Sequence, residues 1–188
     1  MYKYGYLIIE GKFGIQSNPK IGSKYIKIAA DNGNSDAMGY CASLYKNGKG
    51  VTVDFNEAHR YYKMGIDKGS AFAMNDYAYM LQHGQGIDIN YQEVIKYYKM
   101  SIDKGFDDAM NNYACMLEAG DVVAVDKKEA SEYFKKAADK GSASSMFNYG
   151  KMLKNGDGIP KSIKEAMKYL IKAFDNGYKE AIMLELNK

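Results

Sequence analysis

The chain has 188 residues, of which 46% are hydrophobic and 26% charged, and its formal net charge is +3. So small a charge, spread along the sequence, is not typical of nucleic-acid-binding proteins, because these concentrate Lys and Arg on one face. The aliphatic run at residues 7–9 is far shorter than the apolar segment of a signal peptide or the ~20 residues of a membrane-spanning helix. We therefore expect neither a nucleic-acid partner nor direct membrane insertion.

The sequence contains two cysteines, Cys41 and Cys115. Neither belongs to a CxxC pair or a Cys/His cluster, so the sequence predicts no disulfide framework and no metal site. We interpret both as reduced thiols of a cytoplasmic protein, and we expect no cofactor.

A nine-residue segment recurs with one letter changed: YYKMGIDKG at residues 61–69 and YYKMSIDKG at residues 97–105, 36 residues further on. Tyrosines at positions 25, 61, 97, 133 and 169 follow the same spacing. A period of this length is typical of stacked supersecondary units. The spacing predicts a single repeat array over residues 1–188: a degenerate repeat at 1–33, full repeats at 34–69, 70–105, 106–141 and 142–177, and a half repeat at 178–188.

The first helix of each repeat is expected to end at a glycine, and so is the second. The glycines that end first helices are Gly48, Gly84, Gly120 and Gly156, and those that end second helices are Gly33, Gly69, Gly105, Gly141 and Gly177. A glycine after an amphipathic run is typical of a left-handed helix C-cap.

The second helices are expected to begin at short polar residues with Glu three positions later, which is the pattern of a capping box. These residues are Asp54, Asn90, Asp126 and Ser162, and Asn18-Pro19 has the same role in the first repeat. Between these signals, apolar residues follow a helical period, and no strand period occurs. The sequence therefore predicts an all-α fold, a right-handed αα superhelix of eleven short antiparallel helices.

The repeats resemble the Sel1-like repeat family, a relative of the tetratricopeptide repeat. AMNDYAYMLQHGQGIDINYQEVIKYYKMSIDKG and SMFNYGKMLKNGDGIPKSIKEAMKYLIKAFDNG carry the paired loop glycines, the D-x2-E type cap and the YY-K motif of that family. The chain departs from the pattern at Val122, which replaces a loop glycine, at Glu185, which replaces a core residue, and at residues 1–18, which align with a one-residue shift. The resemblance implies a helical adaptor that assembles protein complexes and is not an enzyme.

No catalytic residue is expected. His59 and His83 have no periodic carboxylate or thiol partner, so we interpret them as surface or capping residues. The GKG and GQG segments follow helices and lack the GK[ST] of a phosphate-binding loop. We interpret the Tyr and Met positions as core, and Lys63, Lys99 and Lys135 as solvated.

The candidate binding residues lie on the side of each first helix that faces away from its core stripe, which lines the concave groove in helical-pair solenoids. They are Phe72, Asn75, Tyr79, Asn111, Asn112, Phe147, Asn148 and Lys151. Tyr79 and Phe147 would be apolar anchors, and the Asn amides would bind an extended peptide backbone because an amide both donates and accepts. The alternative is a merely hydrophilic surface that happens to contain Asn. Cys115 is expected on this side, and Cys41 in the core.

The sequence thus favours a protein-interaction scaffold or adaptor that binds a peptide or partner protein. The alternative is a regulatory or targeting region of a larger signalling enzyme, for example a kinase, whose catalytic domain lies elsewhere. End-to-end self-association through the terminal half repeats is a further expected interaction.

Overall fold

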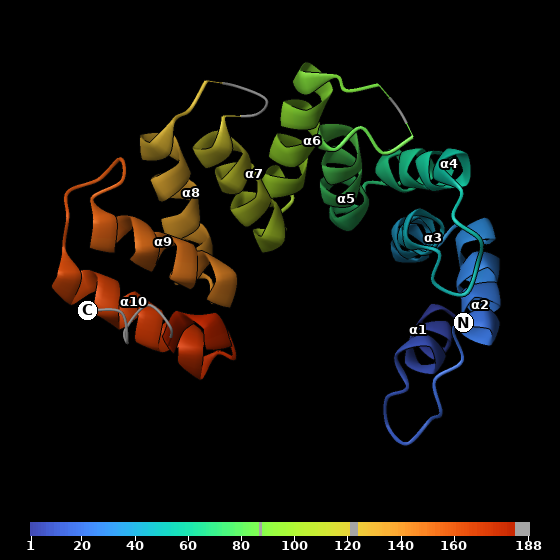
Figure 1. Ribbon diagram of the computed structural model, residues 1–188. Helices are drawn as coiled ribbons and strands as arrows, with labels where there is room; N and C mark the ends of the chain where they lie inside the picture. The colour runs from blue at the N-terminus through green and yellow to red at the C-terminus, as the bar shows by residue number, and fades with distance from the viewer. Residues whose placement is uncertain (87, 121–123, 183–188) are drawn as a thin grey trace. The chain divides into compact units, whose positions relative to one another are not determined.

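The computed structural model describes residues 1–86, 88–120 and 124–182. These residues form ten α-helices and one 3₁₀ helix and contain no β-strand, as the all-α prediction expects (Figure 1). The α-helices are α1 Tyr2–Glu10, α2 Pro19–Asp31, α3 Ser35–Asn47, α4 Phe55–Asp67, α5 Ala71–Gln82, α6 Tyr91–Asp103, α7 Asp107–Ala119, α8 Lys127–Asp139, α9 Ala143–Asn155 and α10 Ile163–Asp175. The expected eleventh helix begins as the 3₁₀ helix η1, Lys179–Ile182. Val122 and Glu185 lie outside the described residues.

The helices belong to two compact units. The first, Met1–Lys104, contains α1 to α6, and the second, Gly105–Lys188, contains α7 to α10 and η1. In the first unit α1 packs against α2, α3 against α4 and α5 against α6, and α3 also contacts both α2 and α5. In the second unit α7 packs against α8, and α9 packs against both α8 and α10 (Figure 1).

The expected helix starts are confirmed. The side chains of Asp54, Asn90, Asp126 and Ser162 each accept a hydrogen bond from the backbone N–H three residues later. Asn18 does the same for the N–H of Ile21, with proline at the first helical position. Each cap satisfies an N–H group that the helix itself leaves unpaired, which contributes about 1 kcal/mol.

The expected helix ends are confirmed as well, since all nine capping glycines have positive φ. Gly105, at φ 82°, has no neighbour within 4 Å of the position that a Cβ would occupy, so its requirement for glycine comes from the backbone conformation alone. Gly50, the second loop glycine of its repeat, has φ 79°, and a Cβ there would also overlap the carbonyl group of Pro19. Gly50 therefore lets a loop of one repeat lie directly on the second helix of the repeat before it.

Tyrosine and methionine fill the core, as expected. Tyr61, Tyr62, Tyr77 and Tyr98 are among the largest fully buried side chains, together with Met74, Met80, Met116 and Met152. Buried tyrosines need a partner for the hydroxyl group. Tyr98 Oη donates to Gln82 at 3.0 Å, and Tyr77 Oη lies 2.9 Å from Nδ1 of His59. The helix phases are also confirmed by the two thiols, because Cys41 is buried and Cys115 is exposed.

Candidate functional site

We call the exposed side of α3 and α5 in the first unit, and of α7 and α9 in the second, the first-helix face. The eight candidate residues lie on α5, α7 and α9, and each unit is described by itself. In the first unit Tyr79 is the candidate that reaches solvent most clearly, with 40% of its surface exposed. His83 stacks on its ring at 4.0 Å, with 26° between the ring planes, and Lys46 Nζ lies 5.0 Å from the ring centroid. Because His83 Nδ1 is also 2.9 Å from the Tyr79 carbonyl oxygen, the aromatic pair is held in one arrangement.

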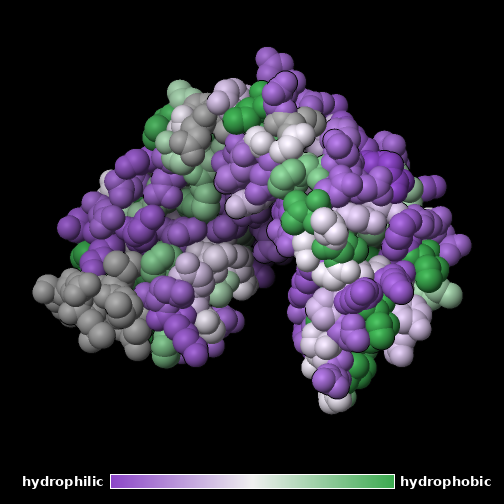
Figure 2. Space-filling view, turned by 45° about the vertical axis from the view of Figure 1, so that its right-hand side comes forward, coloured by the Kyte–Doolittle hydropathy of each residue, from purple (hydrophilic) through white to green (hydrophobic). Residues whose placement is uncertain are grey.

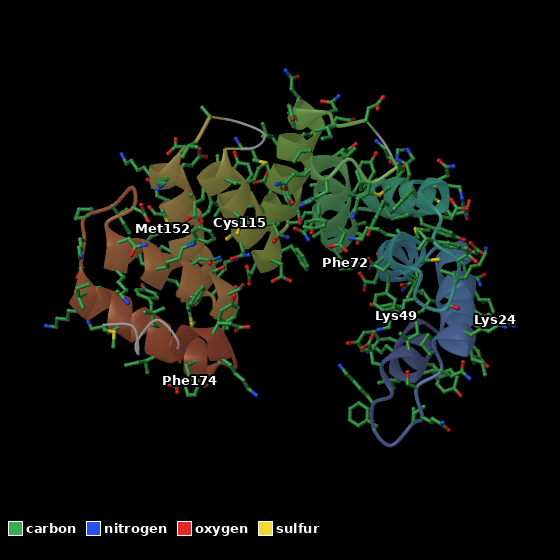
Figure 3. The ribbon with its side chains drawn as sticks, in the orientation of Figure 1. Lys24, Lys49, Phe72, Cys115, Met152 and Phe174 are labelled. Carbon is green, nitrogen blue, oxygen red and sulfur yellow. The ribbon has the colours of Figure 1, made fainter. Side chains whose placement is uncertain are left out.

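Phe72 is half-buried, and its ring covers α3 where Gly39 offers no side chain. A Cβ at Gly39 would be 2.7 Å from Cδ1 of Phe72, so the ring occupies the space that glycine leaves. Figure 3 labels Phe72 on α5. Its contact with α3 means that Phe72 contributes to packing between the two first helices.

The expectation that Asn75 faces solvent is wrong. Its residue surface is only 4% exposed, and its Nδ2 donates to Oδ1 of Asp76 at 2.9 Å. The reason is that α5 packs against α3 as well as against α4 and α6, so three sides of this helix are covered. Asn75 therefore belongs to the packing beneath the face rather than to its accessible part.

In the second unit, α7 and α9 are joined by polar side chains. Oδ1 of Asn111 accepts from Ser145 Oγ at 3.0 Å and from Asn148 Nδ2 at 3.2 Å. Lys151 forms an ion pair with Glu118 at 3.4 Å. Asn112 lies next to this set and is half-buried. The bonds of Asn148 use its amide nitrogen as the donor, so they do not engage its carbonyl oxygen.

Cys115 lies among these amides, on α7 (Figure 3). Its sulfur is 3.8 Å from Nδ2 of Asn148 and 3.9 Å from Nδ2 of Asn111. Although the residue reaches solvent, desolvation by the surrounding atoms, followed by the negative charge of Glu118, raises its pKa to about 11. The thiol is therefore protonated at neutral pH, and it is not a nucleophile of the kind that catalytic cysteines provide.

The sequence predicts Phe147 as an accessible apolar anchor, but the side chain is less accessible than expected. It is only partly exposed, because its ring packs on Tyr178 at 4.8 Å and against the buried cluster of Met146, Leu170 and Ala181. The half repeat that follows α10 brings Tyr178 and Ala181 onto this side of α9. Phe147 thus takes part in packing the last repeat.

Lys63 is not simply solvated, as the sequence had suggested. It is half-buried, its Nζ donates to Tyr97 Oη at 2.9 Å, and it lies 5.0 Å from the ring centroid of Tyr77. In the preceding junction Lys27 Nζ contacts both Asp31, at 2.7 Å, and Tyr61 Oη, at 2.9 Å.

We call this arrangement the junction triad: a Lys and an Asp on one second helix, and a Tyr from the second helix of the next repeat. Tyr61 Oη donates to Asp31 at 2.7 Å, and Tyr169 Oη donates to Asp139 at 3.2 Å, where Asp139 also binds Lys135. The signal that could have revealed the triad is the K-x3-D spacing, which recurs with the same 36-residue period as the tyrosines.

Neither histidine is arranged for catalysis. His59 bonds to Tyr77, and burial followed by the charge of Lys63 lowers its pKa below the usual 6.5. Within the described residues, no group of three or more His, Cys, Asp or Glu side chains could hold a metal ion. Nor does any helix in that part of the chain have the length and apolar character needed to cross a membrane.

The comparison with protein families gives five consecutive matches. The model described as Sel1 repeat matches residues 1–34, 35–70, 71–106, 107–142 and 143–178. No curated protein sequence matches the chain.

Solved structures give the same result for the fold. A Sel1 repeat protein from Oxalobacter formigenes is 28% identical, with a TM-score of 0.84 over 96% of this chain and 73% of that one. The protective antigen c5321 of uropathogenic Escherichia coli, described as displaying an SLR fold, is 23% identical, with a TM-score of 0.73 over 96% of this chain and 38% of that chain. The immunity protein Pa5087 from Pseudomonas aeruginosa is 18% identical, with a TM-score of 0.68 over 96% and 66% of the two chains. The last two structures share only the fold with this chain.

Proposed function

Because the chain belongs to the Sel1 repeat family, whose members generally act as protein-interaction scaffolds, we propose that it is a non-enzymatic adaptor that binds a partner protein on its first-helix face. The partner segment is extended, and its backbone exchanges hydrogen bonds with side-chain amides of α7 and α9. This refines the candidate set of each unit: Tyr79 makes the contact in the first unit, supported by Phe72 and Asn75. In the second unit Asn112, Asn148 and Lys151 make it, supported by Asn111 and Phe147.

The observation that carries the proposal is Tyr79. It is a large aromatic side chain with 40% exposure, it is held by His83 and Lys46, and no helix core requires it at that position. Rigid aromatic residues dominate the energy of protein interfaces because they bury much area and lose little conformational freedom. Since His83 already stacks on the ring, the partner would meet its outer edge and its hydroxyl group.

In the second unit the proposed contact is polar. The carbonyl oxygen of Asn148 is not used in its bonds to Asn111 and Cys115, so it can accept an N–H from a bound backbone. Lys151 is paired with Glu118 at 3.4 Å, and its side chain is 36% exposed, so a partner carboxylate can reach the ammonium group. In this unit the face therefore favours an extended segment with an acidic side chain.

A phage-displayed library of random peptides, selected on the immobilised chain, tests the proposal. Selected peptides should bind Tyr79→Ala, and the double variant of Asn112→Ala with Asn148→Ala, more weakly. The double variant removes two hydrogen bonds of about 0.5–1.5 kcal/mol each, so its dissociation constant should rise roughly five- to a hundredfold.

Matched controls lie on second helices. Tyr91→Ala removes a tyrosine of α6 that is 46% exposed, and Asn56→Ala removes an exposed asparagine of α4. Both should leave peptide binding unchanged. If the controls weakened binding and the first-helix variants did not, the second helices would be the working surface and the proposal would be wrong.

A further inference from the structure

Two positions of the first helices contact each other across neighbouring repeats. One lies five residues before the glycine that ends the helix and is occupied by Tyr79 in α5 and Lys151 in α9. The other lies two residues before that glycine and is occupied by Lys46 in α3 and Glu118 in α7. In the first unit Lys46 Nζ lies 5.0 Å from the centroid of the Tyr79 ring, and in the second unit Glu118 and Lys151 form an ion pair at 3.4 Å. The same contact is therefore made in both units, with different chemistry.

The positive charge of this contact is neutralised in the second unit but not in the first. Glu118 supplies a carboxylate to Lys151, whereas Lys46 has an aromatic ring at the equivalent place. Within residues 1–86, 88–120 and 124–182, Lys46 forms no ion pair. The face of an aromatic ring attracts an ammonium group but carries no net charge. Lys46 can therefore still pair with a carboxylate that a partner brings.

The three carboxylates on the first helices of this unit do not neutralise Lys46. Glu10 on α1 forms an ion pair with Lys49 at 2.7 Å. Both oxygens of Asp76 on α5 accept hydrogen bonds from side chains of the same unit. Asp36 lies ten residues before Lys46 on α3, which is about 15 Å along the helix axis and beyond the range of effective pairing at physiological salt.

The charge of the chain is unevenly divided between the two units. Residues 1–104 contain 13 Lys and Arg and 10 Asp and Glu, whereas residues 105–188 contain 13 of each kind. The net charge of +3 therefore belongs to the unit that contains Lys46. Figure 2 shows hydrophobic side chains among hydrophilic ones at the surface of the N-terminal helices, so this unit offers apolar contact next to positive charge.

We infer that Lys46 and Tyr79 together bind one acidic residue of the partner segment. The carboxylate of an Asp or Glu pairs with the Lys46 ammonium group, and the methylene part of the same side chain packs on the exposed edge of the Tyr79 ring. The ring keeps the ammonium group in place before binding, so less conformational freedom is lost than at an isolated surface lysine. This inference rests on the proposed function and adds the residue type that the first unit selects.

Two phage-displayed peptide libraries test the inference, one random at every position and one that lacks Asp and Glu. Each library is selected on the whole chain after immobilisation. The random library should yield binders that share an Asp or Glu at one position. The library without acidic residues should yield weaker binders or none.

One carboxylate of the tightest peptide should be coupled to Lys46. The peptide is synthesised with each Asp or Glu changed in turn to Asn or Gln, and binding to the wild type and to Lys46→Met is measured by fluorescence anisotropy. One of these changes should weaken binding to the wild type about three- to tenfold, as expected for a pair that stays partly solvated. The same change should leave binding to Lys46→Met unaltered, and Lys46→Arg should retain most of the affinity.

The matched control is Lys96→Met. Lys96 lies on α6, a second helix, and its Nζ is 5.5 Å from the ring centroid of Tyr97, so this variant also removes a lysine beside a tyrosine. It should bind the acidic peptide as tightly as the wild type. Circular dichroism should show the same helix content in all variants.

Equal affinities from the two libraries would overturn the inference, and so would a peptide in which no carboxylate is coupled to Lys46. Sodium phosphate that displaces the peptide more than sodium chloride at equal ionic strength would assign the site to a phosphate group instead. If Tyr79→Ala weakens binding and Lys46→Met does not, this inference fails and the proposed function stands. If neither library yields a binder, both fail.

Discussion

Alanine at Gly50 should destabilise the protein more than alanine at Gly105, although the two glycines have nearly the same backbone conformation. Their φ angles are 79° and 82°. This conformation costs an L-residue about 1–2 kcal/mol. At Gly105 that is the whole cost, since nothing lies within 4 Å of the new Cβ. At Gly50 the Cβ also overlaps the carbonyl group of Pro19, and such overpacking adds about 1–3 kcal/mol.

Thermal unfolding followed by circular dichroism measures the difference. Gly105→Ala should lower Tm by about 2–8 °C, and Gly50→Ala should lower it further. Gly105→Asn is the control, because asparagine tolerates the left-handed conformation better than alanine, so it should cost less than Gly105→Ala. Equal shifts for the two alanine variants would refute the close approach of the loop to α2, and an unchanged Tm for Gly105→Ala would refute the left-handed cap.

Two further results are expected from titratable groups. Cys115 should react with a thiol reagent in the native protein much faster than Cys41, which is buried, and its rate should rise about tenfold per pH unit from pH 7 towards its pKa of about 11; equal rates for the two thiols would contradict the assigned helix phases. Stability should fall as pH decreases from about 6.5, because burial lowers the pKa of His59 and the unfolded chain then binds the proton more readily. Denaturant midpoints measured against pH should show a smaller fall in His59→Gln, and an identical fall would assign the effect to other groups.

The features that the sequence predicted correctly are those that local chemistry decides. A helix start needs a side-chain acceptor such as Asp54, and a left-handed helix end needs a glycine such as Gly105, whatever lies around them. The period of 36 residues then repeats these signals, and it places tyrosine and methionine on the buried stripes. For the same reason the separate environments of Cys41 and Cys115 could be predicted from their repeat positions.

The errors concern contacts between repeats. The burial of Asn75 depends on how closely α5 approaches α3, and the period gives the order of the helices but not that distance. One helix alone predicts that Lys63 is solvated, because the helix leaves it on the outside, whereas Tyr97, 34 residues later, covers it. Phe147 packs on Tyr178, which belongs to the half repeat after α10. Such pairings require the position of a neighbouring repeat and cannot be predicted from one repeat alone.

The junction triad has a consequence for how the chain can change in length. Lys27 and Asp31 bond to Tyr61 of the next repeat, and Lys63 bonds to Tyr97 in the same way. An inner repeat therefore carries the Tyr of the contact with the repeat before it and the Lys of the contact with the repeat after it. A tandem duplication of residues 35–70 would therefore provide a complete triad at the new junction, and all existing ones would be preserved. Gain or loss of whole 36-residue units inside the array is thus compatible with folding, whereas a duplication of any other length would separate the lysine from its tyrosine at the junction where it is inserted.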